Sequence, residues 1–133
     1  MAADFAERAR ALVGTPFRPQ GRSVTTGLDC IGLVMSVFRV PNEGVRRDYR
    51  LRGDHRANIE AGLAQYFCRV RDRRPGDVLL MQSAADQLHL AICTSAGFVH
   101  AHARIGHVVE TPGEPNWPVL GTFRKRVRKG RGD

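Results

Sequence analysis

The apolar residues of this chain follow two different periods, and the change between them divides the sequence. Up to about residue 74 they recur every three or four positions, which is the period of a helix that buries one face. Beyond that point they alternate with polar or small residues, which is the period of a half-buried strand. Helices followed by a series of short strands predict the α+β class, with N-terminal helices packed on an antiparallel β-meander.

Two of the expected helices lie at the ends of the first part. The earlier one has its apolar positions at Phe5, Ala9, Leu12 and Val13. Asp4 followed three residues later by Glu7 has the form of a capping box, so this helix should begin at Asp4. The later one has its apolar positions at Ile59, Leu63, Tyr66 and Phe67, with Asp54 as its expected cap. A basic loop over residues 42–53 precedes it.

A third helix is predicted behind a cysteine, where the chain is apolar on every side. The apolar residues are Ile31, Leu33, Val34, Met35, Val37 and Phe38. Asp29 is a favoured N-cap type, which places Cys30 in the first turn, and the helix should end near Val40 because Pro41 follows. Unpaired N–H groups and the positive end of the helix dipole lower a thiol pKa. Cys30 is therefore the thiol expected to form a thiolate near neutral pH.

Short strands are expected over 78–81, 88–93, 98–103, 107–111 and 120–123. Side chains alternate across a strand, so the length of the connection between 88–93 and 98–103 decides which faces meet. An even connection gathers the histidines on one face and the apolar residues on the other, whereas an odd connection mixes them. The even connection places His89 opposite or diagonal to His100 or His102, roughly 5 Å away at Cβ. Parity does not choose between the two partners.

A thiol is an effective nucleophile when a base lies within hydrogen-bond reach and a third group orients that base. Cys30 and His89 have the composition of such a pair, and either His100 or His102 would orient the imidazole. The alternative is a metal site with ligands from Cys93, His100, His102 and His107. No carboxylate completes that set, so the pattern favours a nucleophile, with no metal and no cofactor.

Composition limits the remaining possibilities. A chain of 133 residues holds one domain, and its three cysteines include no Cys-x-x-Cys pair, which argues against a disulfide framework or a zinc ribbon. The net charge of +8 implies an anionic or acidic partner. Basic residues are concentrated at positions 124–131, and such a segment can give nonspecific, salt-dependent affinity for nucleic acid. No aromatic residues are interleaved with them, so specific recognition of nucleic acid is not expected.

Targeting signals are not recognisable in the sequence. No apolar run reaches the length of a membrane span, and the first residues are acidic and amphipathic rather than signal-like. We therefore expect synthesis in a cytoplasm without a signal peptide. The expected organisation is one domain over 1–123 followed by a basic tail over 124–133.

Five short runs occur in a characteristic order: Gly14-Thr15-Pro16-Phe17, Leu28-Asp29-Cys30-Ile31-Gly32-Leu33-Val34, Arg74-Pro75-Gly76-Asp77-Val78-Leu79, His89-Leu90-Ala91-Ile92 and Gly97-Phe98-Val99-His100-Ala101. In order and spacing they resemble the NlpC-type cell-wall cysteine peptidases, which have a minimal papain-like fold. The run 107–112, Trp117 and the run 121–124 resemble the branch encoded beside tail genes of phages and gene transfer agents. The resemblance covers nearly the whole chain.

This resemblance implies a role for particular residues. Cys30 corresponds to the nucleophile, His89 to the general base and His100 to the orienting third member, while Phe17 and Asp29 fall at substrate-binding positions. The implied reaction is hydrolysis of amide bonds in peptidoglycan stem peptides, next to a D-configured glutamyl residue. Two departures concern the surroundings of the thiol: Ile31 replaces a common serine, and Phe17 replaces a common tyrosine.

The resemblance also implies partners and a location. A protein of this branch would associate with tail-hub or tail-tip proteins and be incorporated in the tail of a phage or gene transfer agent. The alternative within the same fold is a structural tail-hub adaptor with little or no activity.

Overall fold

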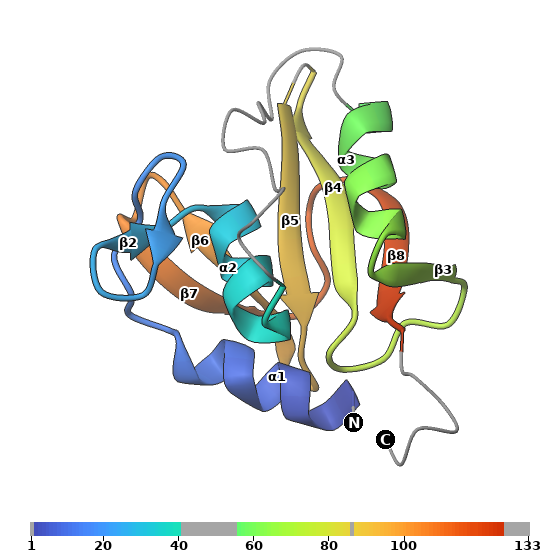
Figure 1. Ribbon diagram of the computed structural model, residues 1–133, viewed down its shortest axis with the longest axis horizontal. Helices are drawn as coiled ribbons and strands as arrows, with labels where there is room; N and C mark the ends of the chain where they lie inside the picture. Colours follow the sequence, from blue (N-terminus) through green and yellow to red (C-terminus); the bar gives the residue numbers. More distant parts are fainter. Residues whose placement is uncertain (1, 41–55, 86, 127–133) are drawn as a thin grey trace.

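The computed structural model of the protein describes residues 2–40, 56–85 and 87–126 (Figure 1). The elements in these ranges are, in chain order, α1 (Ala2–Ala11), β1 (Arg22–Ser23), β2 (Gly27–Leu28), α2 (Cys30–Phe38), α3 (Arg56–Ala64), β3 (Phe67–Val70), β4 (Val78–Ala84), β5 (Gln87–Cys93), β6 (Gly97–His102), β7 (His107–Pro112) and β8 (Val119–Lys125). None of the helices within these ranges is long and apolar enough to cross a membrane. The predicted α+β class is confirmed.

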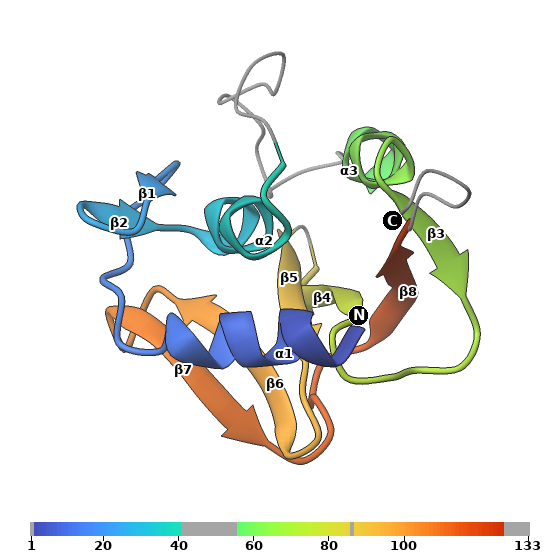
Figure 2. The same cartoon turned by 60° about the horizontal axis from the view of Figure 1, so that its bottom comes forward.

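Six of the strands form one antiparallel sheet in the order β3-β8-β4-β5-β6-β7. Helix α2 packs on β5 and β6, α1 packs against α2 and β5, and α3 lies beside β3 (Figures 1 and 2). The last strand, β8, lies between β3 and β4, so the order of the sheet departs from the order of the chain. The short β1–β2 ladder stands outside this sheet, just before α2.

Apolar side chains gather in two clusters. The larger takes Leu33 and Val37 from α2 and alternate residues of the sheet, such as Leu80 and Leu90. The smaller is formed by Leu79, Met81, Ala91 and Phe98, with Trp117 and Val119 packed against it. Strand β4 contributes to both clusters because neighbouring residues of a strand point to opposite faces. This explains why positions 78–81 form a continuous apolar run rather than an alternating one.

The predicted boundaries of α1 and α3 are wrong. Helix α1 begins two residues before Asp4, so Asp4 lies inside the helix and is not its N-cap. Helix α3 ends before Phe67, which instead begins β3 and is buried in the larger cluster. An aromatic residue directly after a helical pattern fits either element, and only pairing with β8 identifies the strand. The expected cap Asp54 and the basic loop 42–53 lie outside the described residues.

Strand β8 ends two residues later than predicted, and this moves the start of the basic tail. Arg124 and Lys125 belong to the sheet. The Nε and Nη2 atoms of Arg124 each donate to the carboxylate of Asp77 at 2.9 Å, and Asp77 is fully buried. A buried carboxylate requires such a partner. Arg124 is therefore a structural residue of the domain rather than the first residue of a solvated tail.

Candidate active site

Cys30 is the first residue of α2, and Asp29 immediately before it is the N-cap, as the sequence predicted. Asp29 Oδ1 accepts a hydrogen bond from the Gly32 N–H at 2.8 Å, the bond typical of a cap. The same carboxylate accepts the Gln20 N–H at 3.1 Å and Arg22 Nη1 at 2.8 Å. The start of the helix, and with it the thiol, is thereby fixed to the loop that precedes it.

The carboxylate of Asp29 is satisfied within the protein. It lines the same pocket as Cys30, where the sequence predicted a substrate contact. Its ion pair with Arg22 is largely buried, with the two side chains 13% and 4% exposed. These contacts describe a residue that positions α2, and a direct contact of Asp29 with a substrate stays a prediction.

A glycine is required where α2 meets that loop. A Cβ atom at Gly32 would lie 2.0 Å from the carbonyl oxygen of Gly21, far inside van der Waals contact. Phe17, on the same side of the site, is partly buried against the larger cluster and lines the pocket. Its N–H donates to the Gly106 carbonyl at 2.9 Å, which ties this loop to the turn between β6 and β7.

The histidines come from the two strands that the even connection joins. Ile92 pairs with Val99 and Cys93 with Phe98, so four residues separate the paired ends and the predicted parity is confirmed. His89 Nε2 lies 2.9 Å from His100 Nδ1, and the rings meet edge to face at 85°. Parity allows either His100 or His102 as the partner of His89, and this hydrogen bond identifies His100.

His100 and His102 make different contacts. His100 is 2% exposed, and its Nε2 lies 2.9 Å from Thr111 Oγ1 on β7. His102 Nδ1 accepts the N–H of Ile105 at 3.2 Å, which closes the turn after β6. His100 therefore lies inside a line of hydrogen bonds from His89 to Thr111, whereas His102 stabilises a turn.

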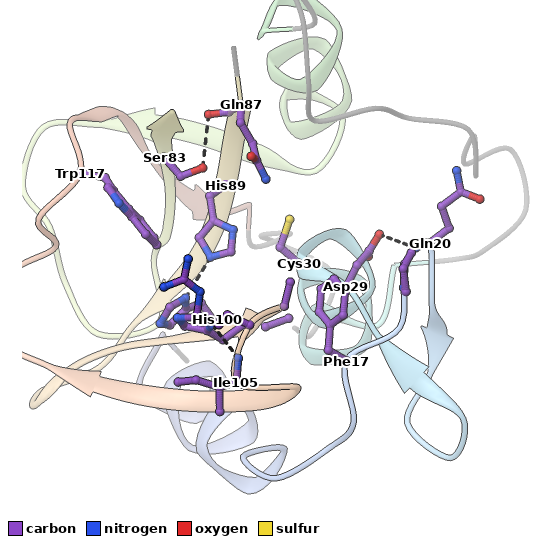
Figure 3. Close-up of a pocket in the computed structure, with 15 residues that line it drawn as sticks. Phe17, Gln20, Asp29, Cys30, Ser83, Gln87, His89, His100, Ile105 and Trp117 are labelled. Carbon is purple, nitrogen blue, oxygen red and sulfur yellow. Dashed lines mark hydrogen bonds between the residues drawn. The ribbon is translucent and has the colours of Figure 1, made fainter. Parts of the chain in front are cut away.

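Cys30, His89 and His100 share one pocket of about 790 Å³. In Figure 3 Cys30 and Trp117 lie on opposite sides of the His89 ring. The indole meets the His89 ring edge to face, with centroids 5.2 Å apart. The complete lining is Phe17, Pro19, Gln20, Asp29, Cys30, Ser83, Gln87, His89, His100, Ala101, His102, Ala103, Arg104, Ile105 and Trp117.

Burial determines the protonation of the thiol. Cys30 is 2% exposed, and its burial, together with the Asp29 carboxylate, raises the pKa of the thiol to about 12. Backbone hydrogen bonds at Leu90 and Cys30 and the charge of Arg22 lower the pKa, but by less. The prediction that Cys30 is a thiolate in the resting protein is therefore wrong. The cost of desolvating a charged sulfur outweighs the stabilisation that the N-terminus of the helix gives to the thiolate.

Burial also keeps the imidazoles neutral. It lowers the pKa of His89 to about 3, and the neighbouring His100 and His102 lower it further. Burial and then His102 lower the pKa of His100 to about 4. At neutral pH the pocket thus holds a neutral thiol beside a neutral imidazole, which can accept the thiol proton during a reaction rather than before it.

The other two cysteines lie away from this pocket's lining. Cys68 is exposed on β3, where Arg126 Nε donates to its sulfur at 3.2 Å, and Cys93 is buried on β5. Within the described residues, no three His, Cys, Asp or Glu side chains converge in a way that would hold a metal ion. The ring nitrogens of His100 contact His89 and Thr111. Neither residue belongs to the alternative set of metal ligands that the sequence offered.

Sequence reasoning missed several residues of the pocket. In the sequence Trp117 is named only in the resemblance to the tail-encoded branch, and Thr111, which contacts His100 without lining the pocket, only as part of an expected strand. Arg104, Ser83 and Gln87 also line the pocket without having been anticipated. No local pattern marks these positions, because each reaches the site through strand pairing or a turn.

Two solved structures share this fold. The NlpC/p60 domain of the peptidoglycan hydrolase SagA matches with a TM-score of 0.58 and 23% identity, over 84% of this chain and 89% of that one. A Staphylococcus aureus protein described as similar to lipoprotein, of the NLP/P60 family, matches with a TM-score of 0.60 and 19% identity. That match covers 96% of this chain and 42% of the other.

At these sequence identities, the structural similarity establishes the fold alone. The architecture is that of NlpC/p60 domains, and the predicted papain-like NlpC-type fold is confirmed. No protein-family model matches the sequence, and no curated protein matches it.

Proposed function

We propose that this protein is a cysteine peptidase that hydrolyses amide bonds in peptidoglycan stem peptides. The observation that carries the proposal is one pocket lined both by a thiol at the N-terminus of a helix and by an imidazole that a second imidazole orients. The fold it shares with a domain of a peptidoglycan hydrolase supports the substrate class.

The hydrogen-bond line explains how His89 would act as the base. If Nε2 of His89 carries the proton, it donates to His100 Nδ1 across 2.9 Å, and His100 Nε2 then donates to Thr111 Oγ1. Nδ1 of His89 keeps its lone pair, free to accept the proton of Cys30. His100 and Thr111 are positioning residues, since they select the tautomer and orientation of the base.

The reaction then follows in two steps. His89 Nδ1 takes the proton from Cys30 as the sulfur attacks the amide carbon, and the resulting oxyanion accepts the Cys30 N–H at the helix start. The imidazolium returns this proton to the leaving nitrogen, so the C–N bond breaks and a thioester remains. A water, deprotonated by His89, attacks the thioester carbon and releases the acid and the free thiol.

Transfer of the Cys30 proton to His89 during the attack is consistent with a resting state in which both groups are neutral. A buried thiolate–imidazolium pair would have to be desolvated in the free protein, whereas a substrate that fills the pocket brings a carbonyl dipole to the sulfur. We expect the pocket lining, and Trp117 in particular, to keep water from the pair until substrate binds.

Digestion of purified peptidoglycan tests this function. The protein and its Cys30→Ala variant are incubated with the polymer, and the soluble fragments are identified by mass spectrometry. We expect fragments with new amino and carboxyl ends from the wild type and none from the variant. Equal fragment yields from both proteins would contradict the proposal.

The proposed setting is the tail of a phage or gene transfer agent, with tail-hub or tail-tip proteins as partners and synthesis in the bacterial cytoplasm. Its support is the resemblance of the runs 107–112 and 121–124, with Trp117, to the tail-encoded branch. Mass spectrometry of purified tail particles from producing cells should detect the chain, and its absence from them would contradict this setting.

A structural adaptor is the second candidate, and the burial of Cys30 favours it. The thiol is 2% exposed, its pKa is raised to about 12, and phenylalanine occupies the common tyrosine position. An adaptor would be inert on every peptidoglycan tested, and its Cys30→Ala variant would enter tail particles as the wild type does. Cleavage that depends on Cys30 excludes an inert adaptor.

A further inference from the structure

We infer that Arg104, with His102 two residues before it in the chain, forms a subsite for a carboxylate of the substrate next to the scissile amide. The inference rests on the proposed function and narrows it: the peptide cleaved would carry a free carboxylate beside the bond, rather than a free amine or an amidated acid.

Among the described residues that line the pocket, one cationic side chain has no ion-pair partner. Asp29 is the single acidic residue among the described lining residues, and Arg22 neutralises it at 2.8 Å. The buried His89 and His100 are neutral near pH 7. Arg104 lines the pocket and forms no ion pair within the described part of the chain. The described lining therefore carries a net positive charge toward a bound ligand.

The turn that carries Arg104 is held at both ends. His102 Nδ1 accepts the N–H of Ile105 at 3.2 Å, and the His102 carbonyl accepts the N–H of Gly106 at 2.8 Å. The Gly106 carbonyl in turn accepts the N–H of Phe17 at 2.9 Å, on the loop that leads to Cys30. The backbone of Arg104 is thus fixed relative to the nucleophile, while its side chain stays exposed to solvent and ligand.

His102 would add a second donor. Because its Nδ1 accepts a backbone N–H, the neutral ring carries its proton on Nε2, and His102 lines the same pocket. A guanidinium binds a carboxylate through two parallel N–H···O bonds, and such charge-assisted pairs are stronger than neutral ones. An ammonium group would instead find Asp29 already paired and would be repelled by Arg104.

Two synthetic stem peptides that differ at one group test the subsite. One carries a free α-carboxylate on the glutamyl residue, and the other carries the corresponding amide. Cleavage of both is measured for the wild type, for Arg104→Gln, and for Arg71→Gln as control, because Arg71 is an exposed arginine outside the pocket lining. We expect the wild type to prefer the acid by about tenfold to a hundredfold in kcat/KM, as for one charge-assisted contact.

The variants should separate binding from chemistry. Arg104→Gln should raise KM for the acid peptide toward that for the amide while leaving kcat within about twofold, and Arg71→Gln should match the wild type. Equal wild-type rates on both peptides, or an equal loss on both in Arg104→Gln, would overturn the subsite while cleavage itself stands.

A binding measurement keeps the subsite testable if the wild type cleaves neither peptide. Affinities of both peptides are measured by calorimetry for Cys30→Ala and for the Cys30→Ala, Arg104→Gln double variant. Preference for the acid peptide that disappears in the double variant supports the subsite even if the proposed hydrolysis fails. Equal affinities in Cys30→Ala overturn it.

Discussion

The two walls of the pocket are held in place by different kinds of contact. On the thiol side, an ion pair and backbone N–H groups converge on the carboxylate of Asp29, and a glycine allows the helix to touch the loop. On the histidine side, three neutral side chains follow one another from His89 to Thr111. The first wall fixes where the nucleophile stands, and the second fixes which nitrogen of the base is free. Damage to the first should reduce stability, and damage to the second should reduce rate.

Removal of an imidazole should have the largest effect. General-base catalysis contributes about 10²–10⁴ in rate, so His89→Ala and His100→Ala should each lose cleavage by that order. His102→Ala should retain measurable turnover, because His102 stabilises a turn and is not in the line to Thr111. Rates on a synthetic stem peptide are compared, with circular dichroism as the folding control. An inactive His102→Ala beside an active His100→Ala would reverse the assignment.

Substitutions on the thiol side of the pocket should lower the free energy of unfolding. Asp29→Ala removes the partner of Arg22, whose side chain is 4% exposed and whose Nε and Nη2 already lack hydrogen-bond partners among the residues that the structure describes. Breaking such a buried pair costs about 3–5 kcal/mol of unfolding free energy. Arg22→Met should cost less, because Asp29 keeps the N–H groups of Gln20 and Gly32. Urea unfolding measures both, and equal losses would show that the ion pair is not the dominant contact.

Acid should weaken the histidine-side wall. The pKa values of His89 and His100 are lowered to about 3 and about 4, so the folded state binds fewer protons than the unfolded state below pH 6.5. Stability is then complete above pH 6.5 and falls as the pH drops, by about 1.4 kcal/mol per pH unit for each histidine. Urea midpoints between pH 7 and 4.5 test this. His100→Gln should have a shallower slope than the wild type, and an unchanged slope would contradict the assignment.

Loss of the Thr111 hydroxyl, which ends the series of hydrogen bonds from His89, should have the smallest effect on the rate of cleavage. Thr111→Val removes the hydroxyl beside His100 Nε2 while keeping the shape of the side chain. We expect kcat to fall about tenfold, in line with the loss of one hydrogen bond of roughly 1–1.5 kcal/mol. Thr111→Ser restores the hydroxyl and should recover the rate, which a purely structural defect would not predict. The pH dependence of kcat should shift in the valine variant and not in the serine one.

The difference between the walls also explains what the sequence could predict. Asp29 as cap of the Cys30 helix is a local pattern, and the parity of the β5–β6 connection follows from the hydrophobic alternation. The pKa of Cys30 depends on how completely the fold covers the sulfur, which no local pattern reports. Trp117 reaches the site through a loop, and Thr111 through the pairing of β6 with β7. Sequence reasoning therefore anticipated the main residues and missed those that support them.

The position of β8 has a consequence for how the chain folds during its synthesis. Because β8 lies between β3 and β4, the facing edges of both strands stay open until residues 119–125 have left the ribosome. Asp77 likewise waits for Arg124, its guanidinium partner from 47 positions later in the chain. Open strand edges can pair with other chains, so a stalled or truncated nascent chain would be prone to aggregation. Among the described strands, β8 is translated last, and it is the strand that joins β3 to the rest of the sheet.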